Sequence, residues 1–151
     1  MSNRLRVLIV GYGNPLRGDD GFGWRAAERL KELIDDRGIG VLTLHQLTPE
    51  LMELLSRAGF AVFLDARQGA NPGEILERPL DPRPAPAGAF THHLTPEGLL
   101  GGALALYGHA PQAVLITVTG RNFELSERLS PEVAGSLEPA VAAALRYATT
   151  R

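Results

Sequence analysis

The segment that most constrains the fold lies near the start of the chain, in residues 6–23. Its first part, residues 6–11, is a short apolar run that predicts a buried β-strand. The run ends in glycines, and the turn after it carries the adjacent acidic residues Asp19 and Asp20 to the start of an amphipathic helix. Open α/β sheets bind their ligands at the carboxyl ends of the strands. The pattern Gly-x-Gly-Asn-x-x-x-x-Asp-Asp-Gly-x-Gly therefore predicts an α/β fold with carboxylates at such a site.

The rest of the chain alternates between strand and helix patterns. Three expected helices begin with a Ser/Thr-Pro-Glu sequence, in which the hydroxyl suits the cap, proline the first turn and glutamate the dipole. The opening order of strand, helix, strand, helix, strand favours a mainly parallel sheet covered by helices. The length of 151 residues predicts a single domain, residues 1–151. We expect strands at residues 6–11, 40–46, 60–65, 73–80 (an edge strand) and 113–118, and helices at about residues 20–34, 48–59, 95–108 and 130–147.

The composition excludes several classes of protein. The formal net charge is −2 at pH 7 and no basic stripe is present, so nucleic acid is not an expected partner. Cysteine is absent, which excludes disulfides, cysteine-ligated zinc and a thiol nucleophile. No apolar run approaches membrane-spanning length, and the first residues lack the apolar core of a signal peptide. We therefore expect a cytoplasmic protein with no nucleic-acid or membrane partner.

Carboxylate and imidazole side chains occur where predicted strands end or helices begin. Asp19 and Asp20 follow the first strand, Asp65 ends the strand at residues 60–65, and His92 and His93 precede the helix at Thr95. In a parallel sheet these ends lie on one edge and can converge. Two carboxylates and one imidazole form an incomplete ligand set for a divalent ion such as Ni²⁺ or Zn²⁺, with positions open for water or substrate.

Each of these residues also has a structural interpretation. Asp20 can cap the first helix, and Asp65 can close a turn through a bond to the backbone. Asn14 can order its turn or contact a substrate backbone. His45 lies within a strand pattern and His109 follows the end of a helix, so we expect no functional role for either.

At this point the chain resembles the hydrogenase maturation proteases, the endopeptidases that trim the large subunit of nickel–iron hydrogenases. The matching motifs occur in the family's order and spacing and cover nearly the whole chain. They imply a three-layer α/β/α fold of the phosphorylase/hydrolase-like kind, with a twisted, mainly parallel five-stranded sheet. The motifs are Ile9-Val10-Gly11-x-Gly13-Asn14 through Asp19-Asp20-Gly21-x-Gly23, Val62-Phe63-Leu64-Asp65-Ala66, Thr91-His92-His93-Leu94-Thr95-Pro96, and Glu127-x-Leu129-Ser130-Pro131-Glu132-Val133.

The resemblance also implies a metal site. The family's first ligand falls on Asp20 and its second on Asp65, while the third is a histidine before the penultimate helix. The spacing to the helix start favours His92, with His93 as the alternative. Nickel is expected to arrive with the substrate, and Zn²⁺ or Cd²⁺ could occupy the site in a crystal. The resemblance leaves open whether Asp19 takes part and which group acts as general base.

The implied function is one specific cleavage that activates a hydrogenase. An enzyme of this type removes the C-terminal extension of the large-subunit precursor once nickel has been inserted. The resemblance thus implies a hydrolase of the aspartyl-type endopeptidase class. We infer metal-assisted hydrolysis, in which the ion polarises the scissile carbonyl or activates water. Asp20, Asp65 and His92 would then check that the substrate carries its metal.

Other functions fit the sequence less well. A non-catalytic, nickel-sensing docking factor for the immature subunit would carry the same ligands. Peptidyl-tRNA hydrolases also begin with a strand and a Gly-x-Gly-Asn-Pro turn, here residues 11–15, but the histidine of their next segment is absent and the acidic balance suits tRNA poorly. A nucleotide-binding domain would place phosphate at residues 18–21, where two aspartates would repel it.

Overall fold

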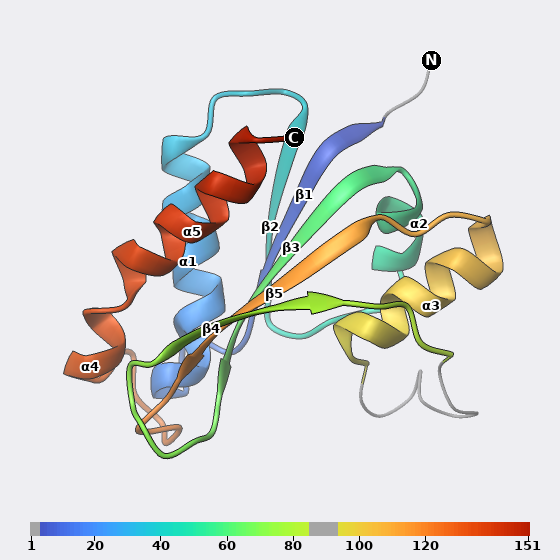
Figure 1. The fold of residues 1–151 in the computed structure, drawn as a ribbon. Helices are drawn as coiled ribbons and strands as arrows, with labels where there is room; N and C mark the ends of the chain where they lie inside the picture. The colour runs from blue at the N-terminus through green and yellow to red at the C-terminus, as the bar shows by residue number, and fades with distance from the viewer. Residues whose placement is uncertain (1–3, 85–93) are drawn as a thin grey trace.

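The structure is a computed structural model that describes residues 4–84 and 94–151 (Figure 1). Within these residues, no helix is long and apolar enough to cross a membrane. The strands are β1 (Leu5–Tyr12), β2 (Ile39–Leu44), β3 (Ala58–Arg67), β4 (Ile75–Leu80) and β5 (Gln112–Thr119). A 3₁₀ turn, η1 (Gly18–Gly21), precedes the helices α1 (Phe22–Leu33), α2 (Leu51–Ser56), α3 (Pro96–Tyr107), α4 (Pro131–Ala134) and α5 (Leu137–Thr149).

The strands form one twisted sheet in the order β2-β1-β3-β5-β4. All neighbours are parallel except β4, which runs antiparallel to β5 at the edge. In Figure 1, α1, α4 and α5 lie on one side of the sheet and α2 and α3 on the other. The predicted α/β/α fold, its five-stranded mainly parallel sheet and its edge strand are therefore confirmed.

The central strands are apolar throughout because both of their faces are covered. Val7 and Ile9 of β1 pack into the core beneath α1 and α5. Leu8 and Val10, one residue out of phase, pack into the second core beneath α2 and α3. Successive side chains of a strand point to opposite faces, so a strand covered on both sides needs a continuous apolar run. This is why the run at residues 6–11 identified the strand.

The prediction of one helix over residues 130–147 is wrong. The structure has two helices, and α4 ends at Ala134 while α5 begins at Leu137. Pro139 lies four residues after Gly135 and has no N–H to donate to the Gly135 carbonyl, so an uninterrupted helix would leave that carbonyl unpaired. The break also turns the Ser136 hydroxyl toward the Gly73 carbonyl, to which it donates a hydrogen bond.

Two other helices are shorter than predicted. The residues expected to begin the first helix form the 3₁₀ turn η1, and α1 starts only at Phe22. The helix expected at residues 48–59 is limited to α2, because the backbone N–H of Leu51 bonds to the Thr48 carbonyl in a turn and β3 already starts at Ala58.

Glycines let α1 approach the sheet closely beside the ends of β1 and β3. A Cβ atom on Gly23 would overlap the carbonyl oxygens of Leu64 and Tyr12. A Cβ atom on Gly11 would overlap the Gly23 carbonyl and the Ala27 side chain. The start of α1 therefore depends on these two glycines for its position.

We predict that Gly23→Ala lowers the free energy of unfolding by about 1–3 kcal/mol or more, because the added methyl meets backbone atoms that cannot rotate away. Urea unfolding checks this. Gly135→Ala is the matched control, since a Cβ there lies in ordinary contact, 3.5 Å from the Pro131 carbonyl oxygen. Equal stability of the two variants would contradict the prediction.

Candidate functional site

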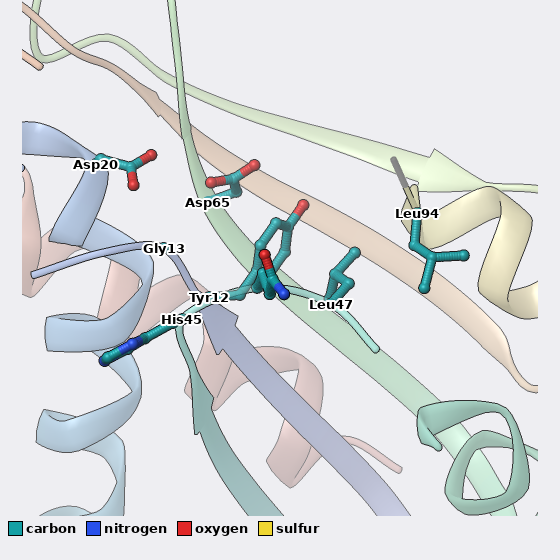
Figure 2. Close-up of a pocket in the computed structure, with 8 residues that line it drawn as sticks. Tyr12, Gly13, Asp20, His45, Leu47, Asp65 and Leu94 are labelled. Carbon is teal, nitrogen blue, oxygen red and sulfur yellow. The ribbon is translucent and has the colours of Figure 1, made fainter. Parts of the chain in front are cut away.

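A cavity of about 250 Å³ opens at the carboxyl ends of β1, β2 and β3. Figure 2 shows Asp20 and Asp65 on its wall, with the Tyr12 ring beside Asp65. The cavity lies at the sheet edge that the sequence predicted for a ligand. Its lining residues are Tyr12, Gly13, Asp20, His45, Gln46, Leu47, Asp65 and Leu94.

The turn after β1 fixes Asp20 at this cavity. Its carboxylate Oδ2 accepts a hydrogen bond of 2.8 Å from the backbone N–H of Asn14. Gly13 has a φ of 137°, and a Cβ atom there would overlap the Asp20 carbonyl oxygen. The Asn14 side chain in turn accepts a hydrogen bond of 2.9 Å from the N–H of Leu16. The glycine and asparagine of the motif thus shape a turn that orients the second aspartate.

Asp65 reaches the cavity from the end of β3. Its Oδ1 accepts a hydrogen bond of 2.8 Å from the N–H of Ala66. Burial raises the pKa of Asp65 from its ordinary value of 3.8 to about 7. The bonds from Ala66 and from the Tyr12 side chain lower this pKa, whereas the negative charge of Asp20 raises it. The two carboxylates therefore repel one another, and a cation between them would relieve that repulsion.

Tyr12 supplies a neutral polar group beside Asp65 in the cavity. Burial and the adjacent Asp65 raise the pKa of the Tyr12 phenol well above its usual range, so the hydroxyl keeps its proton. A protonated hydroxyl donates to a carboxylate, which is the role it has toward Asp65. The sequence motifs do not single out Tyr12 as a functional residue, although it lies between Gly11 and Gly13 at the end of β1.

Asp19 has a different environment from its neighbour Asp20 and does not line the cavity. It is completely buried. Its carboxylate accepts hydrogen bonds from the N–H groups of Arg121, Asn122 and Ser130, and from the Ser130 hydroxyl, at 2.7–3.0 Å. Burial alone would raise the pKa of Asp19, but these bonds hold it below its usual value. Asp19 therefore joins the turn at η1 to the segment between β5 and α4.

The predicted third ligand, His92 or its alternative His93, lies outside the described residues. Leu94, the first residue described after that segment, lines the cavity. Within residues 4–84 and 94–151, no group of three or more His, Asp and Glu side chains is placed to hold a metal ion. The described chain brings together two predicted ligands, Asp20 and Asp65, whose carboxylate oxygens suit a divalent cation.

His45 also lies at the cavity, although its sequence context suggested no role. It follows β2 directly, and its ring lies against Trp24 with the centroids 5.0 Å apart. In Figure 2 the ring points away from Asp65. The predicted strand extended to residue 46 and so hid the fact that His45 stands at a strand end. His109 lies elsewhere, with its Nε2 3.1 Å from the Ala58 carbonyl oxygen.

Several known proteins similar to this chain have names that refer to hydrogenases. No protein-family model matches the chain. The hydrogenase expression/formation protein HupD of Rhodobacter capsulatus is 30% identical over 156 residues, which cover 93% of this chain and 70% of HupD.

Solved structures agree with this relationship. The hydrogenase maturating endopeptidase HybD from E. coli is 27% identical and has a TM-score of 0.74, with 95% of this chain and 93% of HybD covered. The [NiFe] hydrogenase maturation protease HycI from Thermococcus kodakarensis KOD1 is 27% identical and has a TM-score of 0.76, with 98% and 95% covered.

We predict that Asp65→Asn stabilises the metal-free protein against unfolding above about pH 7. Between its ordinary pKa of 3.8 and its folded pKa of about 7, Asp65 binds more protons in the folded chain than in the unfolded one. Wild-type stability therefore falls as pH rises through this range, and the full cost is present above it. The neutral asparagine avoids a cost of at most about 4 kcal/mol.

Urea unfolding with a chelator at several pH values between about 4 and 8 checks this prediction. The gain should be largest above pH 7 and vanish near pH 4. Asp35→Asn, a change at an exposed position, is the matched control. A gain that is absent, or that grows toward acid pH, would contradict the prediction.

Proposed function

Because the chain belongs to the family of hydrogenase maturation proteases, and is thus a peptidase, we propose that it removes the C-terminal extension of a nickel–iron hydrogenase large-subunit precursor after nickel insertion. The observation that carries the proposal is the meeting of Asp20 and Asp65 in one cavity at the carboxyl edge of the sheet. The resemblance to the family implies that these two residues are the first two metal ligands.

The nickel ion is part of the substrate in this proposal. Asp20 and Asp65 bind it with carboxylate oxygens, and His92, or His93, completes the set with an imidazole nitrogen. Asn14 and Ala66 hold the two carboxylates in place through their backbone N–H groups. The ion polarises the scissile carbonyl or lowers the pKa of a water molecule.

Binding of the ion also changes the protonation of the site. Asp65 has a raised pKa in the free protein, and a divalent cation beside it favours the ionised form. Binding therefore releases the proton that Asp65 carries near neutral pH. Tyr12 keeps its proton throughout and continues to donate toward Asp65. A precursor without nickel offers no cation to separate the two carboxylates. The proposed place of the reaction is the cytoplasm.

We predict that Asp20→Asn and Asp65→Asn each lower cleavage of the nickel-loaded precursor by about 100-fold or more. Loss of a group in the outer shell of a metal costs 10–100-fold, and loss of a charged ligand should cost at least as much. Intact-mass analysis of the precursor measures the cleavage. Asp35→Asn again serves as the control, because it makes the same chemical change at the surface.

The same experiment separates the proposed peptidase from a docking factor. A mass loss that matches one C-terminal segment, in the nickel-loaded sample only, supports metal-dependent cleavage. Binding of a verified nickel-loaded precursor without any mass loss would favour a non-catalytic docking factor. Near-normal cleavage by either aspartate variant would contradict the proposed ligand set.

We predict that His92→Ala damages cleavage far more than His93→Ala, because the family spacing favours residue 92 as the imidazole ligand. The two variants make the same change at adjacent positions, so each is the control for the other. Cleavage rates of the nickel-loaded precursor distinguish them. The opposite order would move the ligand to His93.

A further inference from the structure

The register of the sheet brings the side chains of Tyr12 and Asp65 together. The strands β1 and β3 are parallel neighbours, and Val10 of β1 pairs with Phe63 of β3. Tyr12 and Asp65 each lie two residues further along their strand. Val10 and Phe63 both lie in the core beneath α2 and α3. Because side chains alternate along a strand, Tyr12 and Asp65 leave the sheet on that same face, next to one another.

The Tyr12 side chain connects the core to the cavity. Its ring packs against the core beneath α2 and α3, and Tyr12 also lines the cavity. Figure 2 shows the ring beside the Asp65 side chain. The Tyr12 hydroxyl donates a hydrogen bond to the Asp65 carboxylate. Tyrosine has only two side-chain torsions, so a ring packed against a core presents its hydroxyl at a fixed point.

Two donors fix the Asp65 carboxylate and leave it able to bind a cation. The terminal torsion of aspartate is broad, so the single bond from the adjacent N–H of Ala66, 2.8 Å from Oδ1, holds the carboxylate plane only weakly. The Tyr12 hydroxyl adds a second donor from the neighbouring strand. An ionised carboxylate has about four acceptor positions. The positions that these two donors do not use are available to a ligand in the cavity that Asp65 lines.

The end of β1 and the turn after it support both carboxylates, but by different means. Asn14 holds Asp20 through its backbone N–H, which donates to Oδ2 at 2.8 Å. Tyr12 holds Asp65 through a side-chain hydroxyl. A substitution at Tyr12 that keeps the ring therefore removes a support of Asp65 and leaves the support of Asp20 in place.

We propose that Tyr12 is a positioning residue of the cation site, and that its hydroxyl holds the Asp65 carboxylate in the orientation that binds the nickel ion of the precursor. This inference rests on the proposed function, since it assigns a further residue to the recognition of the same ion. Hydrogen-bond partners of metal ligands account for about 10–100-fold in metal affinity. Tyr12 acts through Asp65, so its effect is confined to a precursor that carries nickel.

The test measures Kd for the nickel-loaded and the nickel-free precursor by rapid mixing, before cleavage occurs. Tyr12→Phe removes only the hydroxyl oxygen, and we expect it to raise Kd for the nickel-loaded precursor about tenfold or more. Kd for the nickel-free precursor should stay within about twofold of wild type. In an Asp65→Asn background, Tyr12→Phe should change neither Kd by more than about twofold, because the charge that Tyr12 orients is gone. Tyr107→Phe is the matched control, since Tyr107 is 52% exposed at the end of α3.

Three results would overturn the proposal. An unchanged Kd for the nickel-loaded precursor, in a Tyr12→Phe variant that unfolds in urea like wild type, would show that the hydroxyl does not position Asp65. An equal loss of affinity for both precursors would assign Tyr12 to the peptide instead of the ion. A full effect of Tyr12→Phe in the Asp65→Asn background would show that Tyr12 does not act through Asp65. Wild-type protein that binds neither precursor, or both equally, would refute the proposed function together with this inference, whereas the three results above refute this inference alone.

Discussion

The position of Asp20 at the cavity depends on Asp19, a carboxylate that does not itself line the cavity. Asp19 is fully buried and is bonded by three backbone N–H groups and one hydroxyl of the segment between β5 and α4. An ionised group is buried at such a position only where hydrogen bonds replace its water. Because Asp19 is fixed, the next residue, Asp20, leaves the 3₁₀ turn in one direction, toward Asp65. The acidic pair of the motif thus combines an anchor with a candidate ligand.

Asp65 contrasts with Asp19, because its surroundings raise its pKa and those of Asp19 lower it. Asp19 receives enough donors to keep its pKa low, whereas Asp65 receives bonds from Ala66 and Tyr12 that do not offset its burial and the charge of Asp20. A group whose charged form is disfavoured in the free protein, and which shares a cavity with a second carboxylate, is suited to a ligand that brings positive charge.

Local pattern decided which parts of this molecule could be predicted from sequence. The apolar run at residues 6–11 located β1, because a strand covered on both faces has an unmistakable composition. The break between α4 and α5 is not evident from the pattern, because helical periodicity continues across Gly135 and only Pro139 marks the interruption. The partners of Asp19 lie more than 100 residues away along the chain, and no local pattern specifies them. Tyr12 and His45 reach the cavity through the register of β1 and β2, which the sequence leaves undetermined.

The electrostatics of the cavity give a physical reason for nickel dependence within the proposed function. In the free protein, burial and, to a smaller extent, the charge of Asp20 keep Asp65 partly protonated near neutral pH. An apo-precursor that docks without its ion would displace water from two carboxylates and leave their repulsion uncompensated. A loaded precursor brings the charge that both carboxylates lack, and the same burial that disfavours ionised Asp65 then strengthens its attraction to the cation. Discrimination between the two precursors therefore requires no conformational change in the protein. It follows from placing the buried Asp65 beside a second carboxylate, and from leaving the compensating charge to the substrate.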